Sequence, residues 1–319
     1  MIAATAPNKF VLAPPSKAGD IAFKFLTWGM AMMVFVLVAL VGWELFQGSK
    51  LSLRQFGWSF LIHDWDPGNG NFGALPFIFG TFVSSLLGLM IALPLSLATA
   101  TYLTELAPRW VRQPAMTLIE MLAAIPSVIL GLWGIYVLVP WLREHPYPLL
   151  QKLLGWLPVF HGHIYGQCIL SAAVIVAIMM VPIITALARE VFRAVPDSQR
   201  EAAFALGATR WEVTRLAVFK GSRRGLFGAA MLGLGRALGE TMAVTMVIGN
   251  STDLSASLFA PGSTLASAIA NQFSEAVDGT YRSALFELGL VLLLVTILTN
   301  ILAHLLIGAV SGPKDAAHT

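Results

Sequence analysis

The sequence has 319 residues, of which 57% are hydrophobic and only 12% charged, with a mean hydropathy of +0.75. A soluble domain carries about 25% charged residues, so this composition excludes a soluble protein and predicts an integral membrane protein. The excess of 20 Lys and Arg over 17 Asp and Glu is mild, and in a membrane protein it indicates cytoplasmic loops, not nucleic-acid binding. The single cysteine, Cys168, excludes an intrachain disulfide. His161 and His163 stand in a Pro- and Gly-rich loop without acidic partners, so no metal site is predicted.

Six hydrophobic runs dominate the chain, and each is near or above the roughly 20 residues that a membrane-spanning helix needs. Only helices and closed barrels satisfy the backbone within lipid. We therefore predict an all-α integral membrane protein with one domain of six transmembrane helices, residues 23–310, between tails at 1–22 and 311–319. The expected spans are Phe23–Leu45, Leu75–Leu103, Ala115–Leu142, Gln167–Phe192, Gly225–Gly249 and Ser283–Val310.

Two prolines fall inside the expected spans, Pro94 in the second and Pro126 in the third. Proline is tolerated in membrane helices, where it produces either a kink or a broken helix. A plain kink is the favoured interpretation at both positions, and the broken helix stays open. Between the fifth and sixth spans, Thr264–Val277 has the pattern of a short amphipathic helix at the membrane surface or of a re-entrant segment.

Basic residues are distributed unequally between the two sets of loops. Because cytoplasmic loops are enriched in Lys and Arg, we predict that both termini and residues 194–224 are cytoplasmic. The basic set is Lys9, Lys17, Lys24, Arg109, Arg112, Arg189, Arg193, Arg200, Arg210, Arg215, Lys220, Arg223, Arg224 and Lys314. The opposite loops hold Lys50, Arg54, Arg143, Lys152 and Arg282.

The loop 194–224 is patterned as two short helices joined by a glycine turn. Ser198 with Glu201, and Thr209 with Glu212, have the spacing of capping boxes, which start helices. Gly207 supplies the left-handed residue that favours a helix end. Helices this short need packing for stability. Two interpretations follow: the apolar face docks into a partner protein, or the hairpin lies flat on the membrane with its arginines on lipid headgroups.

A charged pair, Arg236 and Glu240, lies near the centre of the fifth run. A central charge costs about 2.5–3.5 kcal/mol on the insertion scale, so such residues are functional by default. Their spacing places both on one face of a continuous helix. The structural interpretation is a buried ion pair that fixes the span to a neighbour. The functional one is an anion relay, because a guanidinium matches oxyanions with a planar fork and keeps its charge.

Several segments resemble one family of transporters. The motif Glu201-Ala202-Ala203-x-x-x-Gly207 is similar to the coupling motif of permeases in bacterial ATP-binding-cassette importers. The family's motif normally ends in Leu-Pro where this chain has Phe219-Lys220, so the second helix is expected to run on toward Gly221. Other segments closely resemble the C-type permeases of phosphate-specific importers, and the resemblance covers nearly the whole chain. These segments are Trp65–Leu75, Leu103–Pro108, Ala124–Gly134 and Gly235–Asn250.

The resemblance implies a MetI-like type I permease fold with six spans, both ends inside, and roles for particular residues. In the family, the hairpin docks on the ATPase and passes its closure to the membrane helices. The residues implied for that coupling are Glu201, Ala202, Ala203, Gly207, Trp211 and Glu212. The substrate pathway is expected to include Arg236 and Glu240, with Ser127 and Glu120 as further polar candidates. Glu120 fits equally an interfacial position near Arg112.

The expected function is that of a transport subunit in the bacterial inner membrane, not an enzyme. It takes inorganic phosphate from a binding protein on the outer side and conducts it inward by alternating access when a dimer of cassette ATPase subunits closes. The chain has no phosphate-binding loop for a nucleotide, so no cofactor is expected and ATP is bound by the partner. Six spans are few for a pathway, so a paralogous second permease is also expected. The alternatives are a sulfate or molybdate permease and an autonomous anion transporter or channel.

Overall fold

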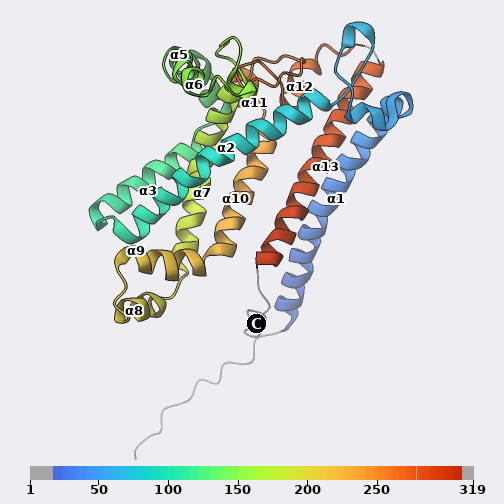
Figure 1. The fold of residues 1–319 in the computed structure, drawn as a ribbon. Coiled ribbons are helices and arrows are strands. Elements are labelled where there is room, and N and C mark those ends of the chain that lie inside the picture. The colour runs from blue at the N-terminus through green and yellow to red at the C-terminus, as the bar shows by residue number, and fades with distance from the viewer. Residues whose placement is uncertain (1–16, 278, 311–319) are drawn as a thin grey trace, which may run out of the picture. The chain divides into compact units, whose positions relative to one another are not determined.

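The structure is a computed structural model that describes residues 17–277 and 279–310. The expected C-terminal tail, 311–319, and residues 1–16 of the expected N-terminal tail lie outside the described residues. Within the described ranges the secondary structure is helical, apart from two isolated β-bridges (Figure 1). The chain divides into two units, residues 1–45 and 46–319.

The described helices follow one another closely along the chain, with short 3-10 and π turns labelled η. The first group is α1 (Lys17–Phe56), η1 (Gly57–Leu61), η2 (Pro67–Asn69), α2 (Leu75–Thr101), η3 (Tyr102–Leu106), α3 (Arg109–Ala124), α4 (Ser127–Trp133), η4 (Gly134–Leu138), α5 (Val139–Glu144), α6 (Pro146–Leu154) and η5 (Pro158–Phe160). The second group is α7 (Ile169–Arg193), α8 (Asp197–Ala205), α9 (Arg210–Val213), η6 (Thr214–Phe219), α10 (Arg223–Leu238), α11 (Met242–Val247), α12 (Leu265–Gln272) and α13 (Gly279–Val310).

Five helical stretches among the described residues are long and apolar enough to cross a membrane. They correspond to the first, second, fourth and sixth expected spans and to the second part of the third. The expected fifth span is interrupted, and neither of its two pieces reaches spanning length alone. The five stretches are Gly19–Leu61, Leu75–Leu106, Ser127–Glu144, Ile169–Arg193 and Gly279–Gly308.

The first unit contains the described part of α1 up to Leu45. Its large apolar side chains, such as Trp28 and Phe35, are exposed over the whole length of the helix. A helix that is apolar all round is stable only in lipid or against other apolar surfaces. The unit therefore has the properties of a membrane-embedded helix.

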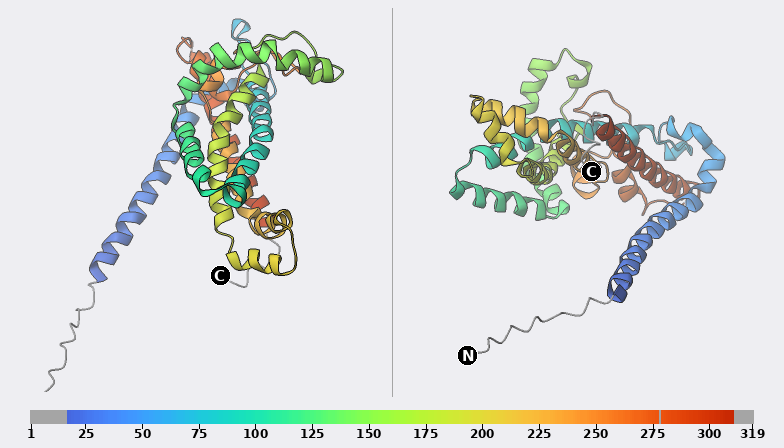
Figure 2. Two further views of the ribbon diagram at one scale, coloured as in Figure 1. Left: turned by 90° about the vertical axis from the view of Figure 1, so that its left-hand side faces the viewer. Right: turned by 90° about the horizontal axis from the view of Figure 1, so that it is seen from below.

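The second unit is built around α7, which packs along α2 (Figure 2). Small residues allow the two backbones to approach closely, as is usual between membrane helices. A Cβ atom on Gly88 of α2 would lie 3.1 Å from the carbonyl oxygen of Ala173. Further along, the hydroxyl of Ser96 donates to the carbonyl oxygen of Val181 at 3.3 Å. Helices α3, α10 and α11 pack on α7, and α13 packs in turn on α10.

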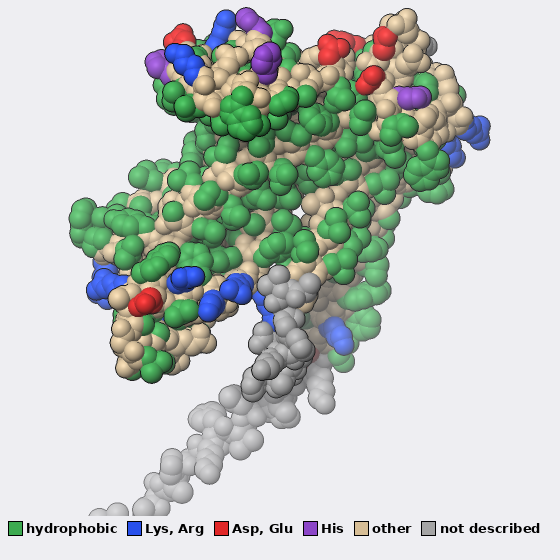
Figure 3. Space-filling view, viewed as in Figure 1, with side chains coloured by type: hydrophobic (Ala, Val, Ile, Leu, Met, Phe, Trp, Pro, Cys, Tyr) green, Lys and Arg blue, Asp and Glu red, His purple; other side chains and the backbone are tan. Residues whose placement is uncertain are grey.

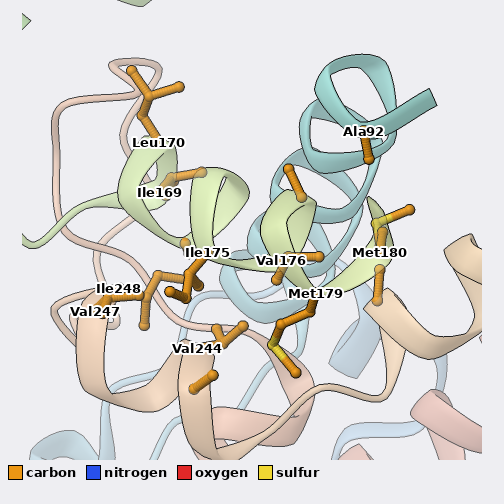
Figure 4. Packing of buried hydrophobic residues seen from close by; sticks show 14 of the residues in the cluster. Ala92, Ile169, Leu170, Ile175, Val176, Met179, Met180, Val244, Val247 and Ile248 are labelled. Carbon is orange, nitrogen blue, oxygen red and sulfur yellow. The ribbon is translucent and has the colours of Figure 1, made fainter. Parts of the chain in front are cut away.

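Figure 4 shows how α11 joins this core, with Val244, Val247 and Ile248 directed toward Ile175 of α7. The end of α11 is also tied to the start of α7, because the amide of Cys168 donates to the carbonyl oxygen of Val247 at 3.1 Å. Short as it is, α11 is therefore firmly held in the core of the second unit.

A second core lies at the end of the unit opposite the α8–α9 segment (Figure 1). Trp65 packs edge-on against Phe72 and Phe77, with ring centroids 5.0 and 5.2 Å apart. The short helix expected within Thr264–Val277 is present as α12, with its first turn buried and packed between α2 and α13. Between the two ends, the face in Figure 3 shows a broad band of hydrophobic side chains, as expected for a surface that faces lipid or other apolar chains.

Candidate functional site

Two helices are broken inside the segments that we expected to be continuous spans. In the third expected span, α3 ends at Ala124 and α4 begins at Ser127, with Ile125 and Pro126 in extended conformations. The plain kink expected at Pro126 is therefore wrong. The physical reason is that the ring of a proline disfavours the helical conformation of the residue before it. Pro94, in contrast, lies inside the continuous helix α2.

The second break lies in the fifth expected span. Here α10 ends at Leu238 and α11 begins at Met242. Gly239 has left the helical conformation, with φ −95° and ψ 2°, and Thr241 has φ −109° and ψ −66°. A continuous helix over Gly225–Gly249 is therefore also wrong. Glycine inside a helix lowers its stability by about 1 kcal/mol relative to alanine, and threonine is also a poor helix former. The helix propensity of this segment is therefore low, and a break here has a small energetic cost.

The two short helices that follow the breaks, α4 and α11, pack against each other. A Cβ atom on Gly131 of α4 would lie 3.0 Å from Cα of Ala243, and one on Gly134, where η4 continues α4, would lie 2.9 Å from Cγ1 of Val247. The residue further along α4 and η4 thus meets the residue further along α11, so the two helices run in the same direction. Both begin at the same end, and the structure therefore brings the segment before Ser127 toward the segment before Met242.

Arg236 and Glu240 occupy different environments on the two sides of the second break. Arg236 is exposed in the last turn of α10, whereas Glu240 lies beyond the helix end and is 9% exposed. The expectation that both share one helix face is wrong, because the helix stops before Glu240. The Oε1 atom of Glu240 instead accepts a bond from the amide of Ala243 at 3.4 Å, in the first turn of α11.

One face of α10 is uncovered within the second unit, and Arg236 belongs to it. Gly228 and Gly235 have open space where a Cβ atom would stand, and Leu232 is exposed. The opposite face is closed, since a Cβ atom on Gly233 would lie 2.8 Å from the side chain of Ile184 in α7. We call the first surface the open face of α10, and it consists of Gly228, Leu232, Gly235, Arg236 and Gly239.

The other two polar candidates lie before and after the first break. Ser127 is half-buried in the first turn of α4. It therefore lies at the N-terminal end of α4, which is the end near the second break. Glu120 is exposed on α3. Arg112 turns to the backbone, donating to the carbonyl oxygens of Thr104 and Ala107 at 3.0 and 3.3 Å. The structure therefore groups Ser127 with the Glu240 segment more closely than it does Glu120.

Residues 197–219 form the expected helix, glycine turn and second helix. Gly207 has φ +81°, the left-handed conformation expected of it. The Thr209 and Glu212 capping box is confirmed, with the Thr209 amide donating to Glu212 Oε2 at 2.8 Å and the Glu212 amide donating to Thr209 Oγ1 at 3.4 Å. The box expected at Ser198 and Glu201 is wrong. Pro196 takes the N-cap position instead, so Ser198 lies inside the first turn.

The departure at Phe219-Lys220 has the expected consequence. The second helix continues as the π turn η6 and reaches Gly221, since the amide of Ser222 donates to the carbonyl oxygen of Val218 at 3.0 Å. Lys220 has the amide hydrogen that a proline lacks, so a helix can pass through this position.

The hairpin has one packed face and one uncovered face. Val218 is buried against Phe192 of α7 and Ala100 of α2. Leu206 at the turn is 90% exposed. The other coupling candidates are also on or near the uncovered surface: Glu201, Ala202, Gly207, Trp211 and Glu212 are exposed, and Ala203 is half-exposed. Exposed apolar side chains gathered at one tip are a feature that interaction surfaces often have.

Sequence reasoning gave no role to Glu105, which lies in η3 and pairs with Arg200 of α8 at 3.2 Å. Both side chains are largely buried, at 17% and 16% exposed. The sequence signals were its place in the resembling segment Leu103–Pro108 and an acidic residue at the basic end of an apolar run, and neither points to Arg200 as its partner.

Comparison with known proteins identifies the family of this chain. Residues 92–312, which include both breaks and the hairpin, match the family described as "Binding-protein-dependent transport system inner membrane component". A chain of the structure titled "Inward facing conformations of the MetNI methionine ABC transporter" is similar with a TM-score of 0.52 and 19% identity, over 75% of this chain and 94% of that one. The fold is thus that of a membrane subunit of an ABC transporter.

Curated relatives extend over almost the whole chain. The phosphate transport system permease protein PstC of Haemophilus influenzae is 47% identical, covering 92% of this chain and 94% of its own. PstC 2 of Mycobacterium tuberculosis is 37% identical, covering 92% and 93%. The chain belongs to the family of binding-protein-dependent transport system inner membrane components, within the group of PstC permeases. It is the permease component and not the ATPase, and membership implies an ATPase and a binding protein as partners.

Proposed function

We propose that this chain forms part of the pathway by which inorganic phosphate crosses the membrane, and that Arg236 is its anion contact. The observation that carries the proposal is the exposed guanidinium on the open face of α10, next to a helix break. A desolvated oxyanion needs a fixed cation, and a guanidinium provides a charged fork of donors for it. The substrate follows from the relatives named as phosphate transport system permeases.

The break itself supports a pathway. Irregular backbone at membrane depth is tolerated where it lines a cavity or is buried in protein. In many transporters, substrates bind where discontinuous helices meet. Here two such breaks lie at the same end of the α4–α11 pair, with Ser127 and Glu240 beside them. In this proposal Glu240 partners Arg236 when the pathway is empty, or weakens anion binding so that the ion leaves.

A second permease completes the pathway in this proposal. The open face of α10 carries small residues, and such faces are typical of contacts between membrane helices. It also carries Arg236, which would be costly to leave facing lipid. A paralogous subunit on this face shields the arginine and supplies the other wall of the pathway.

The hairpin is proposed to dock on the ATPase, one of two subunits that close on ATP. Its uncovered apolar tip, with Leu206 and Trp211, is the surface available for that contact. Because the hairpin continues through Gly221 and Ser222 into α10, movement of the hairpin reaches Arg236 along one chain segment. Arg236 is therefore part of a moving pathway.

The test is transport by the complete complex in proteoliposomes, with the ATPase, the second permease and the binding protein present. We expect radiolabelled phosphate to accumulate only with ATP, and excess unlabelled phosphate to compete while sulfate and molybdate do not. Competition by sulfate or molybdate would assign the chain to another oxyanion. Uptake that persists without the ATPase would make it an autonomous transporter and overturn the proposal.

A further inference from the structure

Arg200 of α8 points from the hairpin back toward the membrane helices. Its Nη1 atom donates to the carbonyl oxygen of Val195 at 2.6 Å and to Asp197 Oδ1 at 3.0 Å. Its Nη2 atom donates to the carbonyl oxygen of Phe192 at 2.8 Å and to Glu105 Oε1 at 3.2 Å. One guanidinium thus joins the end of α7, the start of α8 and η3.

Glu105 lies in η3, the turn that connects α2 to α3, and α3 ends at the first helix break. Leu103 and Ala107, on either side of it, pack with Met116 of α3 in one buried cluster. A backbone hydrogen bond closes this turn, with the amide of Ala107 donating to the carbonyl oxygen of Tyr102 at 2.7 Å. A force applied to Glu105 therefore acts on α3, which ends at the break before Ser127.

The hairpin is consequently connected to both broken helices, by different means. It reaches the α10–α11 break through the covalent chain, and it reaches the α3–α4 break through Arg200 and Glu105. Since α4 and α11 pack closely against each other, they keep their contact only when both are displaced together. A hairpin attached to α10 alone would displace α11 and leave α4 behind.

We propose that the Arg200–Glu105 ion pair is the second mechanical link of the coupling hairpin, and that Arg200 is a positioning residue for ATP-driven transport. The proposal rests on the proposed function. A purely local role is already filled by other contacts, because the carbonyl oxygens of Phe192 and Val195 anchor Arg200 without Glu105. The attraction between two largely buried opposite charges is stronger than in water, because the local dielectric constant is low. Such a pair can stay together when the hairpin moves.

The same guanidinium offers a matched control. Glu105→Gln removes the buried carboxylate and keeps both backbone anchors, whereas Asp197→Asn removes the other carboxylate partner, whose side chain is 87% exposed. In the reconstituted complex we measure phosphate transported per ATP hydrolysed, together with ATPase binding. Mutations along a coupling route change coupling by several-fold, so we expect Glu105→Gln to lower the ratio about fivefold and Asp197→Asn to leave it unchanged.

Three results would overturn the link. One is an unchanged ratio in Glu105→Gln, and another is loss of ATPase binding in that variant, which indicates a structural role. The third concerns the double variant Glu105→Gln with Arg200→Gln. If the two residues form one link, the double variant couples no worse than Arg200→Gln alone, and an additive loss contradicts it. Failure of the proposed function is distinguishable, because the unaltered complex would then not accumulate phosphate.

Discussion

At the scale of single residues, Arg236 combines exposure within this chain with a position deep in an apolar segment. Among the residues that the structure describes, none lies within 4 Å of a Cβ atom placed on Gly228 or Gly235 of the open face of α10. A guanidinium in this position is stable only if a partner, an anion or water reaches it. In our proposal, the exposed arginine and the buried Glu240 are therefore parts of a site that a second subunit completes.

Arg236→Ala is expected to abolish phosphate uptake while the complex stays assembled. Hydrogen bonds to charged groups contribute about 1.5–3 kcal/mol, so loss of the anion contact predicts at least a tenfold decrease in uptake. Arg236→Lys keeps the charge and loses the planar fork, and should retain partial uptake. Uptake and co-purification of the subunits are measured together. A variant that no longer assembles would favour the alternative of a structural ion pair.

Gly207 controls the hairpin through its backbone alone. It has φ +81°, and a Cβ atom there would meet nothing within 4 Å. Gly207→Val should therefore disturb only the turn, because a left-handed conformation costs about 1–2 kcal/mol for a residue with a side chain and more for a β-branched one. We expect ATP hydrolysis to continue and uptake per ATP to fall. Gly207→Asn is the control, since asparagine tolerates this conformation; equal loss in both variants would contradict the argument.

At the scale of elements, the start of α9 is held by a capping box whose strength depends on pH. Bonds from the Thr209 amide, and then from its hydroxyl, hold the pKa of Glu212 below its ordinary value of 4.5. A carboxyl whose pKa is lowered by folding stabilises the folded state above its unfolded pKa. This contribution is lost as the pH falls below 4.5 and through the lowered pKa.

Thr209→Ala should raise the pKa of Glu212 part of the way toward 4.5, because it removes the hydroxyl bond and keeps the amide bond. Thr209→Ser keeps a capping hydroxyl and should leave the pKa low. The carbon-13 shift of the Glu212 carboxyl, assigned with Glu212→Gln, follows the titration in the purified protein. A low pKa that persists in Thr209→Ala would remove the hydroxyl from the capping interaction.

The elements also show what the sequence predicts and what it misses. Long apolar helices, the Gly207 turn and the Thr209 cap follow from hydropathy and local residue preferences, and the structure has them. The breaks at Pro126 and Gly239 occur where local preference is weak or unfavourable for a helix and where α4 packs against α11, and no window of single sequence reports that packing. Pro94 carries the same local preference as Pro126, yet α2 stays continuous along α7. Tertiary packing decides between a kink and a break.

At the scale of the whole second unit, the basic loops gather at one end. The Arg200–Glu105 pair brings the α7–α8 and α2–α3 connections together there, and the second core, to which α12 contributes, lies at the opposite end (Figure 1). The same division was predicted from the distribution of Lys and Arg. We expect the hairpin end to face the cytoplasm.

Labelling of single cysteines tests this orientation. The native Cys168 is buried, so its background reaction with an impermeant maleimide is low. Leu206→Cys is expected to react in inside-out vesicles only, and Trp58→Cys, also at an exposed position, in right-side-out vesicles only. The reverse pattern would invert the topology and with it the direction of transport.

The same Leu206→Cys variant separates the two interpretations of the hairpin. If the exposed tip docks on the ATPase, inside-out vesicles stripped of the ATPase label readily, and adding the ATPase protects the cysteine. If the hairpin lies on the membrane, its apolar tip is buried among headgroups and acyl chains, so labelling is slow with or without the ATPase. Protection that depends on the ATPase supports coupling through the tip, because lipid is present in both samples and only the protein partner differs. Slow labelling in both samples would leave the hairpin without a docking role.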